Sequence, residues 1–163
     1  MSLWDEGSDS VSNIILAEGV YPILLFNVEM MDSKKGEPQL NLQYKLKNNS
    51  RVFQKFTMGD KYDKWNTWQL GVLGAISILK SEYAKTDDLK VIQKNLFDII
   101  SKLVGHTYLK AEITHNEYNG KTSLRVKLED LTSKEEFDKS ILKYVPKTHT
   151  PNLGIDTSEE IPF

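Results

Sequence analysis

The stretch that decides the fold is QLNLQYKLK, at residues 39–47. Leu40, Leu42, Tyr44 and Leu46 alternate there with polar residues, and a period of two is typical of a half-buried β-strand. The face that carries the leucines is predicted to point into a core, and Tyr44 is predicted to lie there with them. The lysine-bearing face is predicted to meet solvent.

Further strands are predicted on both sides of this stretch. Residues 20–31 are apolar and extended, and because both faces are apolar in the first half, that end is predicted to be buried on both sides. The turn-rich residues 32–38 connect it to residues 39–47 as a hairpin. After a short turn at residues 48–50, a third strand is predicted at residues 51–57.

The hydrophobic period becomes helical after residue 64. The apolar stripe consists of Trp65, Trp68, Val72, Ile76, Leu79 and Tyr83. Trp65 and Trp68 are therefore expected to pack in the core, and Gly71 and Gly74 to permit close packing. Residues 86–88 are expected to cap a second helical stretch that stops at Gly105. Its apolar positions are Ile92, Leu96, Ile99, Ile100 and Leu103.

Two more strands are predicted at residues 108–114 and 122–128, joined by the hairpin dipeptide Asn119-Gly120. The predicted fold class is mainly β with a helical insert. Five strands with a helical segment between strands 3 and 4 are the element order of the OB-fold, a five-stranded Greek-key barrel. A split barrel or an unrelated α+β sandwich would give the same order. A short helix is predicted from residue 134 to residue 144, lined by Phe137, Ile141 and Leu142.

Charge is distributed unevenly along the chain, although the net charge is only −2. Residues 1–18 carry four acids and no bases, residues 19–130 carry 17 bases and 13 acids, and residues 152–163 carry three acids. This split predicts an acidic, loosely attached N-terminal segment (1–18), an OB-fold nucleic-acid-binding domain (19–130), and a linker with an acidic protein-interaction tail (131–163). A solvated surface of mixed charge would give a similar pattern.

Several chemistries lack their residues in this sequence. There is no cysteine, which excludes disulfides and thiolate nucleophiles, and the three histidines do not have metal-ligand spacing. Phosphate-binding loops and nucleophile elbows are absent. We therefore expect a non-enzymatic protein with no metal and no cofactor, although dispersed carboxylates could still converge as in a nuclease. The first six residues predict no secretory signal, and no apolar run approaches the ~20 residues of a membrane span, so a cytoplasmic location is expected.

The outward faces of the predicted strands combine bases with aromatic rings. Cations neutralise phosphates and aromatic faces stack bases, so this combination is typical of single-stranded nucleic-acid binding. The strand positions are Lys45, Lys47, Arg51, Phe53, Lys55, Tyr108, Lys110, Arg125 and Lys127. The predicted hairpin loops add Lys34, Lys35, Tyr118 and Lys121. The same residues could instead serve solubility or lie beneath another segment.

The final residues form a candidate partner-binding motif, Glu159, Glu160, Ile161, Pro162 and Phe163. An apolar end after acidic residues can enter a pocket while the acids steer the approach. This ending resembles the C-terminal tip of bacterial single-stranded-DNA-binding proteins, in which an acidic run precedes Ile-Pro-Phe. The resemblance implies that the tail recruits replication, repair and recombination proteins. It departs from the family in its glutamates and its short linker.

The body resembles a family of small phage proteins, long called a domain of unknown function, that are regarded as OB-fold single-stranded-DNA-binding proteins. The motifs that carry this likeness lie at residues 1–4, 18–21, 33–42 and 117–121. The resemblance implies sequence-independent binding of single-stranded DNA, homo-oligomers, a role in phage DNA replication or recombination, and the host cytoplasm. An OB-like protein-interaction adaptor and a strand-annealing recombination mediator remain alternatives. DNA and RNA also remain open as the strand.

Overall fold

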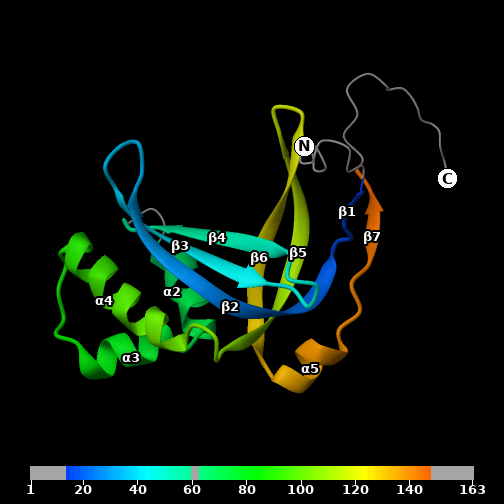
Figure 1. Ribbon diagram of the computed structural model, residues 1–163. Coiled ribbons are helices and arrows are strands. Elements are labelled where there is room, and N and C mark those ends of the chain that lie inside the picture. Colours follow the sequence, from blue (N-terminus) through cyan, green and yellow to red (C-terminus); the bar gives the residue numbers. More distant parts are fainter. Residues whose placement is uncertain (1–13, 60–62, 148–163) are drawn as a thin grey trace, which may run out of the picture.

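The computed structural model describes residues 14–59 and 63–147. This part of the chain is mainly β, with a five-stranded antiparallel sheet and four helices (Figure 1). The strands of the sheet are β2 (Gly19–Asp32), β3 (Pro38–Lys45), β4 (Arg51–Thr57), β5 (Tyr108–Tyr118) and β6 (Lys121–Thr132). Between β4 and β5 lie α2 (Asp63–Val72), α3 (Ala75–Glu82) and α4 (Leu89–Leu103). The predicted strands and the position of the helical insert are therefore confirmed.

The sheet has the strand order β4-β3-β2-β5-β6, and β2 holds its two halves together. The first part of β2 pairs with β5 and the second part with β3, with a bulge between Leu25 and Asn27. A bulge bends and twists a strand, so the sheet curves at this point. The hairpin turns follow their sequence signals. Asn119 and Gly120 have φ of 53° and 77°, as a type I′ turn requires.

The two edge strands, β4 and β6, meet at a seam that is bridged by glutamine side chains. Gln54 of β4 donates from Nε2 to the backbone oxygen of Val126 at 3.3 Å and to Oε1 of Gln69 at 2.8 Å. Gln69 of α2 donates to the backbone oxygen of Leu128 at 3.1 Å and accepts from the Leu128 N–H at 2.6 Å. Side-chain amides thus connect the edges, and they fix α2 at the seam.

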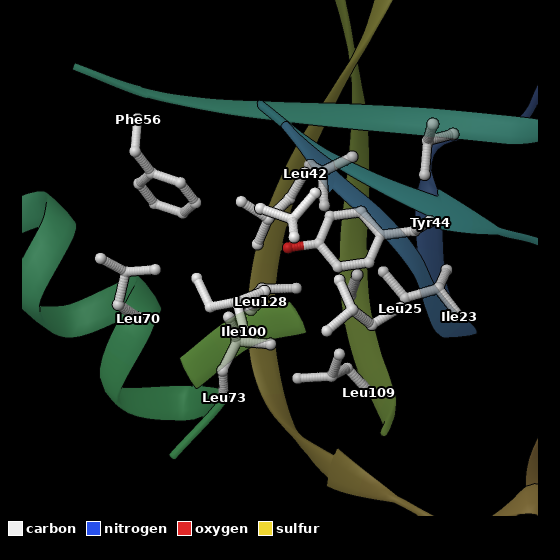
Figure 2. Close-up of a cluster of buried hydrophobic side chains, with 14 of the residues drawn as sticks. Ile23, Leu25, Leu42, Tyr44, Phe56, Leu70, Leu73, Ile100, Leu109 and Leu128 are labelled. Atoms are coloured by element: carbon white, nitrogen blue, oxygen red, sulfur yellow. The ribbon is translucent and has the colours of Figure 1, made fainter. Parts of the chain in front are cut away.

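The core is formed by the inward faces of the sheet and by the helices that cover it (Figure 2). Tyr44 is fully buried, as predicted, and its hydroxyl donates to Oε1 of Gln54 at 2.6 Å. Burial raises the pKa of the Tyr44 hydroxyl well above its ordinary value. Helix α4 presents Leu96, Ile99 and Ile100 to this core, and Asp88 caps it as predicted. Each large apolar side chain buried in this way contributes about 1.5–3 kcal/mol.

The predicted burial of Trp65 and Trp68 is wrong. Their exposed fractions are 39% and 50%, whereas Asn66 and Gln69 on the same helix are buried. The buried face of α2 is partly polar, because the Asn66 amide donates to the backbone oxygen of Thr57 at 2.8 Å and Gln69 bonds to β6. Apolar spacing therefore did not identify the face of α2 that packs inward.

The predicted apolar stripe is also interrupted. Gly74 has a φ of 87° and separates α2 from α3, a conformation that glycine adopts without strain. A Cβ atom added at Gly71 or Gly74 would meet nothing within 4 Å. The expectation that these glycines permit close packing is therefore wrong, and the role of Gly74 is to turn the chain.

Both ends of the described chain pack against the body in a way that the sequence did not predict. Strand β1 (Ile14–Leu16) pairs with β7 (Tyr144–Pro146) in a separate two-stranded sheet, and Leu16 is buried. Helix α5 covers only Lys134–Lys139, so the helix predicted from residue 134 to residue 144 is too long. Ile141 is 75% exposed and does not line a helix with Phe137. In the described ranges, no helix has the length and apolar character that a membrane crossing would need.

Candidate nucleic-acid interface

The outward face of β4 carries three of the predicted binding residues in a row. Arg51, Phe53 and Lys55 are exposed and alternate with buried Val52, Gln54 and Phe56. Phe53 is 50% exposed although it lies in the middle of a strand. The alternation that sends Val52 and Phe56 into the core necessarily sends Phe53 to the opposite face. The sequence prediction for this strand is thus confirmed in its geometry.

A groove of about 450 Å³ lies beside Phe53, between β4 and β6. We call it the seam groove, and its lining residues are Phe53, Gln54, Lys55, Trp65, Asn116, Ser123, Leu124, Arg125 and Val126. Arg125 donates from Nη2 to Oδ1 of Asn116 at 3.1 Å, which restrains its guanidinium at the groove. Aromatic rings and cations from β4, α2 and β6 therefore share one concave surface.

Trp65 is the lining residue that sequence reasoning assigned to the core. Its ring lies edge to face with that of Trp68, with centroids 5.3 Å apart and planes at 89°, an arrangement that aromatic pairs favour. The Lys127 ammonium lies 5.9 Å from the Trp68 ring centroid. Trp65 and Trp68 lie three residues apart, and each is followed by an amide residue, Asn66 and Gln69. A second, polar face at the same spacing would have been the sequence signal that the tryptophans point outward.

The charge of Lys127 is shared with two carboxylates. Its ammonium lies 2.8 Å from Oε1 of Glu112 and 3.2 Å from Oε2 of Glu129. The hydrogen bond to Glu112 raises the pKa of Lys127 most, and the hydrogen bond to Glu129 raises it further. Lys127 is a predicted phosphate ligand that lies near the groove, yet the two carboxylates outnumber its single positive charge.

Phe26 of β2 joins the predicted cations on the outward face. The Lys45 ammonium lies 3.9 Å from its ring centroid and the Arg51 guanidinium carbon lies 4.7 Å from it. Both distances fall within the range for cation–π attraction. Sequence reasoning placed Phe26 on a strand buried on both sides, and the structure places its half-buried ring beneath two cations. Lys45 and Arg51 are thus positioned side by side.

Three other predicted residues lie around the segment that contains α5. The Tyr108 ring packs against Phe137, with centroids 5.2 Å apart, and is half-buried. Lys110 is exposed on the same face of β5, in register with Pro22 and Asp130. Lys47 lies 3.4 Å from the backbone oxygen of Ser140, to which it donates. These residues are not among those that line the seam groove.

The two long hairpins carry the remaining predicted residues of the body. Lys34 and Lys35 are exposed in the β2–β3 turn, where the Ser33 hydroxyl accepts from the Lys35 N–H at 3.2 Å. Tyr118 is 74% exposed at the end of β5, opposite Lys121. Both hairpins extend beyond the sheet toward the top of Figure 1. The predicted partner-binding residues lie outside the described residues, namely Glu159, Glu160, Ile161, Pro162 and Phe163.

Within residues 14–59 and 63–147, no group of three or more histidines and carboxylates could hold a metal ion. The ring of His115 lies with Nε2 at 2.7 Å from the backbone oxygen of Leu16, so it attaches β1 to β5. The Glu18 carboxylate accepts from the His115 N–H at 2.8 Å and strengthens the same contact. His115 therefore has a structural position.

Comparisons with known proteins give no information about the function of the seam groove, which is therefore argued from its geometry. No protein-family model matches the sequence, and the search of curated proteins found no significant match.

Proposed function

We propose that this protein binds single-stranded DNA with little sequence preference and catalyses no reaction. The observation that carries the proposal is the seam groove, where exposed Phe53 and Trp65 lie among the cations Lys55 and Arg125. Cations neutralise backbone phosphates and release counterions, whatever the sequence. Aromatic rings stack on any base that is not already stacked in a duplex.

The topology supports an OB-fold interpretation of the sheet. The strand order β4-β3-β2-β5-β6, with β4 facing β6 across the seam, is consistent with a five-stranded barrel whose edges meet. The helical insert lies between the third and fourth strands of the sheet. OB-folds bind oligonucleotides on the face of their second and third strands and between two flanking loops. In this chain the corresponding elements are β3, β4, and the two long hairpins.

The bound strand would follow the outward face of β4. Arg51 and Lys45, held over Phe26, supply adjacent cations at one end, and Lys55 lies at the other end of the same face. The hairpin residues Lys34, Lys35, Tyr118 and Lys121 would contact a strand that extends past the groove. Each base stacked on an aromatic ring contributes roughly 1–3 kcal/mol, so a few such contacts suffice for specific retention of unpaired DNA.

The wider role proposed here comes from the sequence resemblances. The protein would act in phage DNA replication or recombination, form homo-oligomers on the strand, and recruit DNA-processing proteins through residues 159–163. The acidic tail suits basic-rimmed pockets on such partners. This part of the proposal is independent of the seam groove.

The test is the fluorescence anisotropy of a labelled oligo-dT titrated with the full chain over a series of salt concentrations. We expect log affinity to fall linearly with log salt, by ~0.7 per phosphate contacted. Duplex DNA of equal length should compete at least tenfold less well, and an RNA oligonucleotide in parallel distinguishes the two nucleic acids. Absence of binding at low salt would refute the proposal and favour a protein-interaction adaptor. Accelerated pairing of complementary strands would identify an annealing mediator.

A further inference from the structure

Helix α2 lies against the seam groove in a fixed rotation about its own axis. On its inner side, the Asn66 amide donates to the backbone oxygen of Thr57 at 2.8 Å, and Gln69 exchanges two hydrogen bonds with the backbone of Leu128. Asn66 and Gln69 are three residues apart and so lie on one face of the helix. This double attachment, to β4 at one point and to β6 at the other, prevents α2 from turning.

Trp65 is presented to the groove as a consequence of that attachment. It precedes Asn66 by one residue and therefore projects to the side of the anchored face, where it lines the same groove as Phe53. Trp68 contacts it edge to face and restricts its ring. The arrangement exposes a large aromatic ring at a rigid position, which a merely structural tryptophan would not require.

The groove has room for a planar heteroaromatic ring, and its lining suits one. Its volume of about 450 Å³ lies toward the lower end of the ~300–1,000 Å³ usual for small-ligand sites. Its aromatic residues come from two elements, Phe53 from β4 and Trp65 from α2. The Arg125 guanidinium, held by Asn116, adds a flat cation with donors at the same place.

We infer that the seam groove is a nucleobase pocket, in which one unpaired base is held between Phe53 and Trp65 beside Arg125. The inference rests on the proposed function and names the part of the DNA that this groove takes. A base in a duplex is stacked on both faces and cannot enter, so the pocket selects single strands. The helical insert extends the binding surface of the barrel in this arrangement, and Trp65 is its specificity-determining residue.

The decisive experiment is a double-mutant cycle on oligo-dT affinity with Phe53→Ala and Trp65→Ala. Each variant should weaken binding about tenfold, within the range for one stacked base. If both rings contact one base, the double variant should lose only about 20–30-fold, because the second truncation removes a contact already disrupted. Losses that multiply to about a hundredfold, or a Trp65→Ala variant that binds like wild type, would overturn the inference. Wild-type protein that does not bind oligo-dT would refute the proposed function as well.

Two controls separate stacking from a change in folding. Trp65→Phe keeps a ring and should retain affinity within about threefold, whereas Trp65→Leu keeps apolar bulk and should lose as much as Trp65→Ala. Thr67→Ala, an exposed position on the same helix, should have no effect. Equal losses in Trp65→Phe and Trp65→Leu would indicate packing of α2 and contradict a stacking role.

Fluorescence gives an independent measurement. The chain has three tryptophans, so the double substitution Trp4→Phe and Trp68→Phe leaves Trp65 as the sole reporter. Oligo-dT should quench this emission, and an equal concentration of duplex should not. A matched reporter that keeps only Trp68 should be quenched less. Equal quenching of the two reporters, or none for Trp65 while anisotropy reports binding, would overturn the assignment of the base to Trp65.

Discussion

Phe53 and Tyr108 occupy equivalent positions in the sequence pattern and different positions in the molecule. Alternation places both rings on the outward face of a strand that also carries lysines. Phe53 borders an open groove, whereas Tyr108 packs against Phe137 of α5. The period of a strand determines which face a side chain occupies. The element that lies next to that face decides whether the side chain remains available to a ligand.

The largest expected effect concerns the seam that forms the groove. Gln69→Leu should lower the free energy of unfolding by about 3 kcal/mol, because it leaves the Leu128 N–H and the Gln54 amide buried without this partner. Urea denaturation followed by circular dichroism measures this change. Gln43→Leu, on the outward face of β3, is the matched control and should change it by less than about 0.5 kcal/mol. A Gln69→Leu protein as stable as wild type would mean that the amide bridge does not hold the seam.

The second expected effect is the loss of packing between Tyr108 of β5 and Phe137 of α5. Tyr108→Ala should lower the free energy of unfolding by about 2 kcal/mol, less than a fully buried aromatic, since the ring is only half-buried against Phe137. Its affinity for oligo-dT should stay within about twofold of wild type. Phe53→Ala should give the opposite pattern, with nearly unchanged stability and weakened binding. If Tyr108→Ala weakened binding as strongly as Phe53→Ala, the distinction between Phe53 as a binding residue and Tyr108 as a packing residue would be wrong.

The regular parts of the fold followed from local signals. Residues 39–47, the Asn119-Gly120 turn and the Asp88 cap each depend on interactions between residues close in sequence, so their pattern was sufficient. The outward direction of Phe53 followed from the same alternation. These signals also fixed the order of elements, because a hairpin turn leaves few alternatives for how adjacent strands pair.

The features that the sequence did not predict correctly depend on contacts between residues distant in sequence. The buried face of α2 contains Asn66 and Gln69, whose hydrogen bonds reach Thr57 and Leu128, and no periodicity of apolar residues reports such contacts. Strands β1 and β7 have three residues each, too few for an alternation to be recognised. The seam groove is lined by residues of four elements, and it exists only because the fold brings the edge strands β4 and β6 together.

A third test compares charge at the two ends of the outward face. Lys55→Glu places an acid at the seam groove and should weaken oligo-dT binding about tenfold, or ~1.4 kcal/mol, at moderate salt. Lys110→Glu makes the same change in net charge beside Asp130 and away from the groove, and it should weaken binding by no more than about twofold. Anisotropy at two salt concentrations measures both. Equal losses would mean that the overall charge, and not the groove, controls affinity.

The smallest expected effect concerns Lys127, whose ammonium is paired with two carboxylates. Glu112→Gln removes one of the two carboxylates that hold Lys127, and should leave its ammonium freer to face phosphate near Trp68. Affinity for oligo-dT should rise about threefold at low salt, and the gain should shrink at 1 M salt, where the screening length falls to about 3 Å. Glu82→Gln on α3 changes net charge equally at a residue that does not line the groove, and should give a smaller gain. Equal gains would show that removing any acid suffices, whereas a larger gain for Glu112→Gln would identify Lys127 as a phosphate ligand restrained by its neighbours.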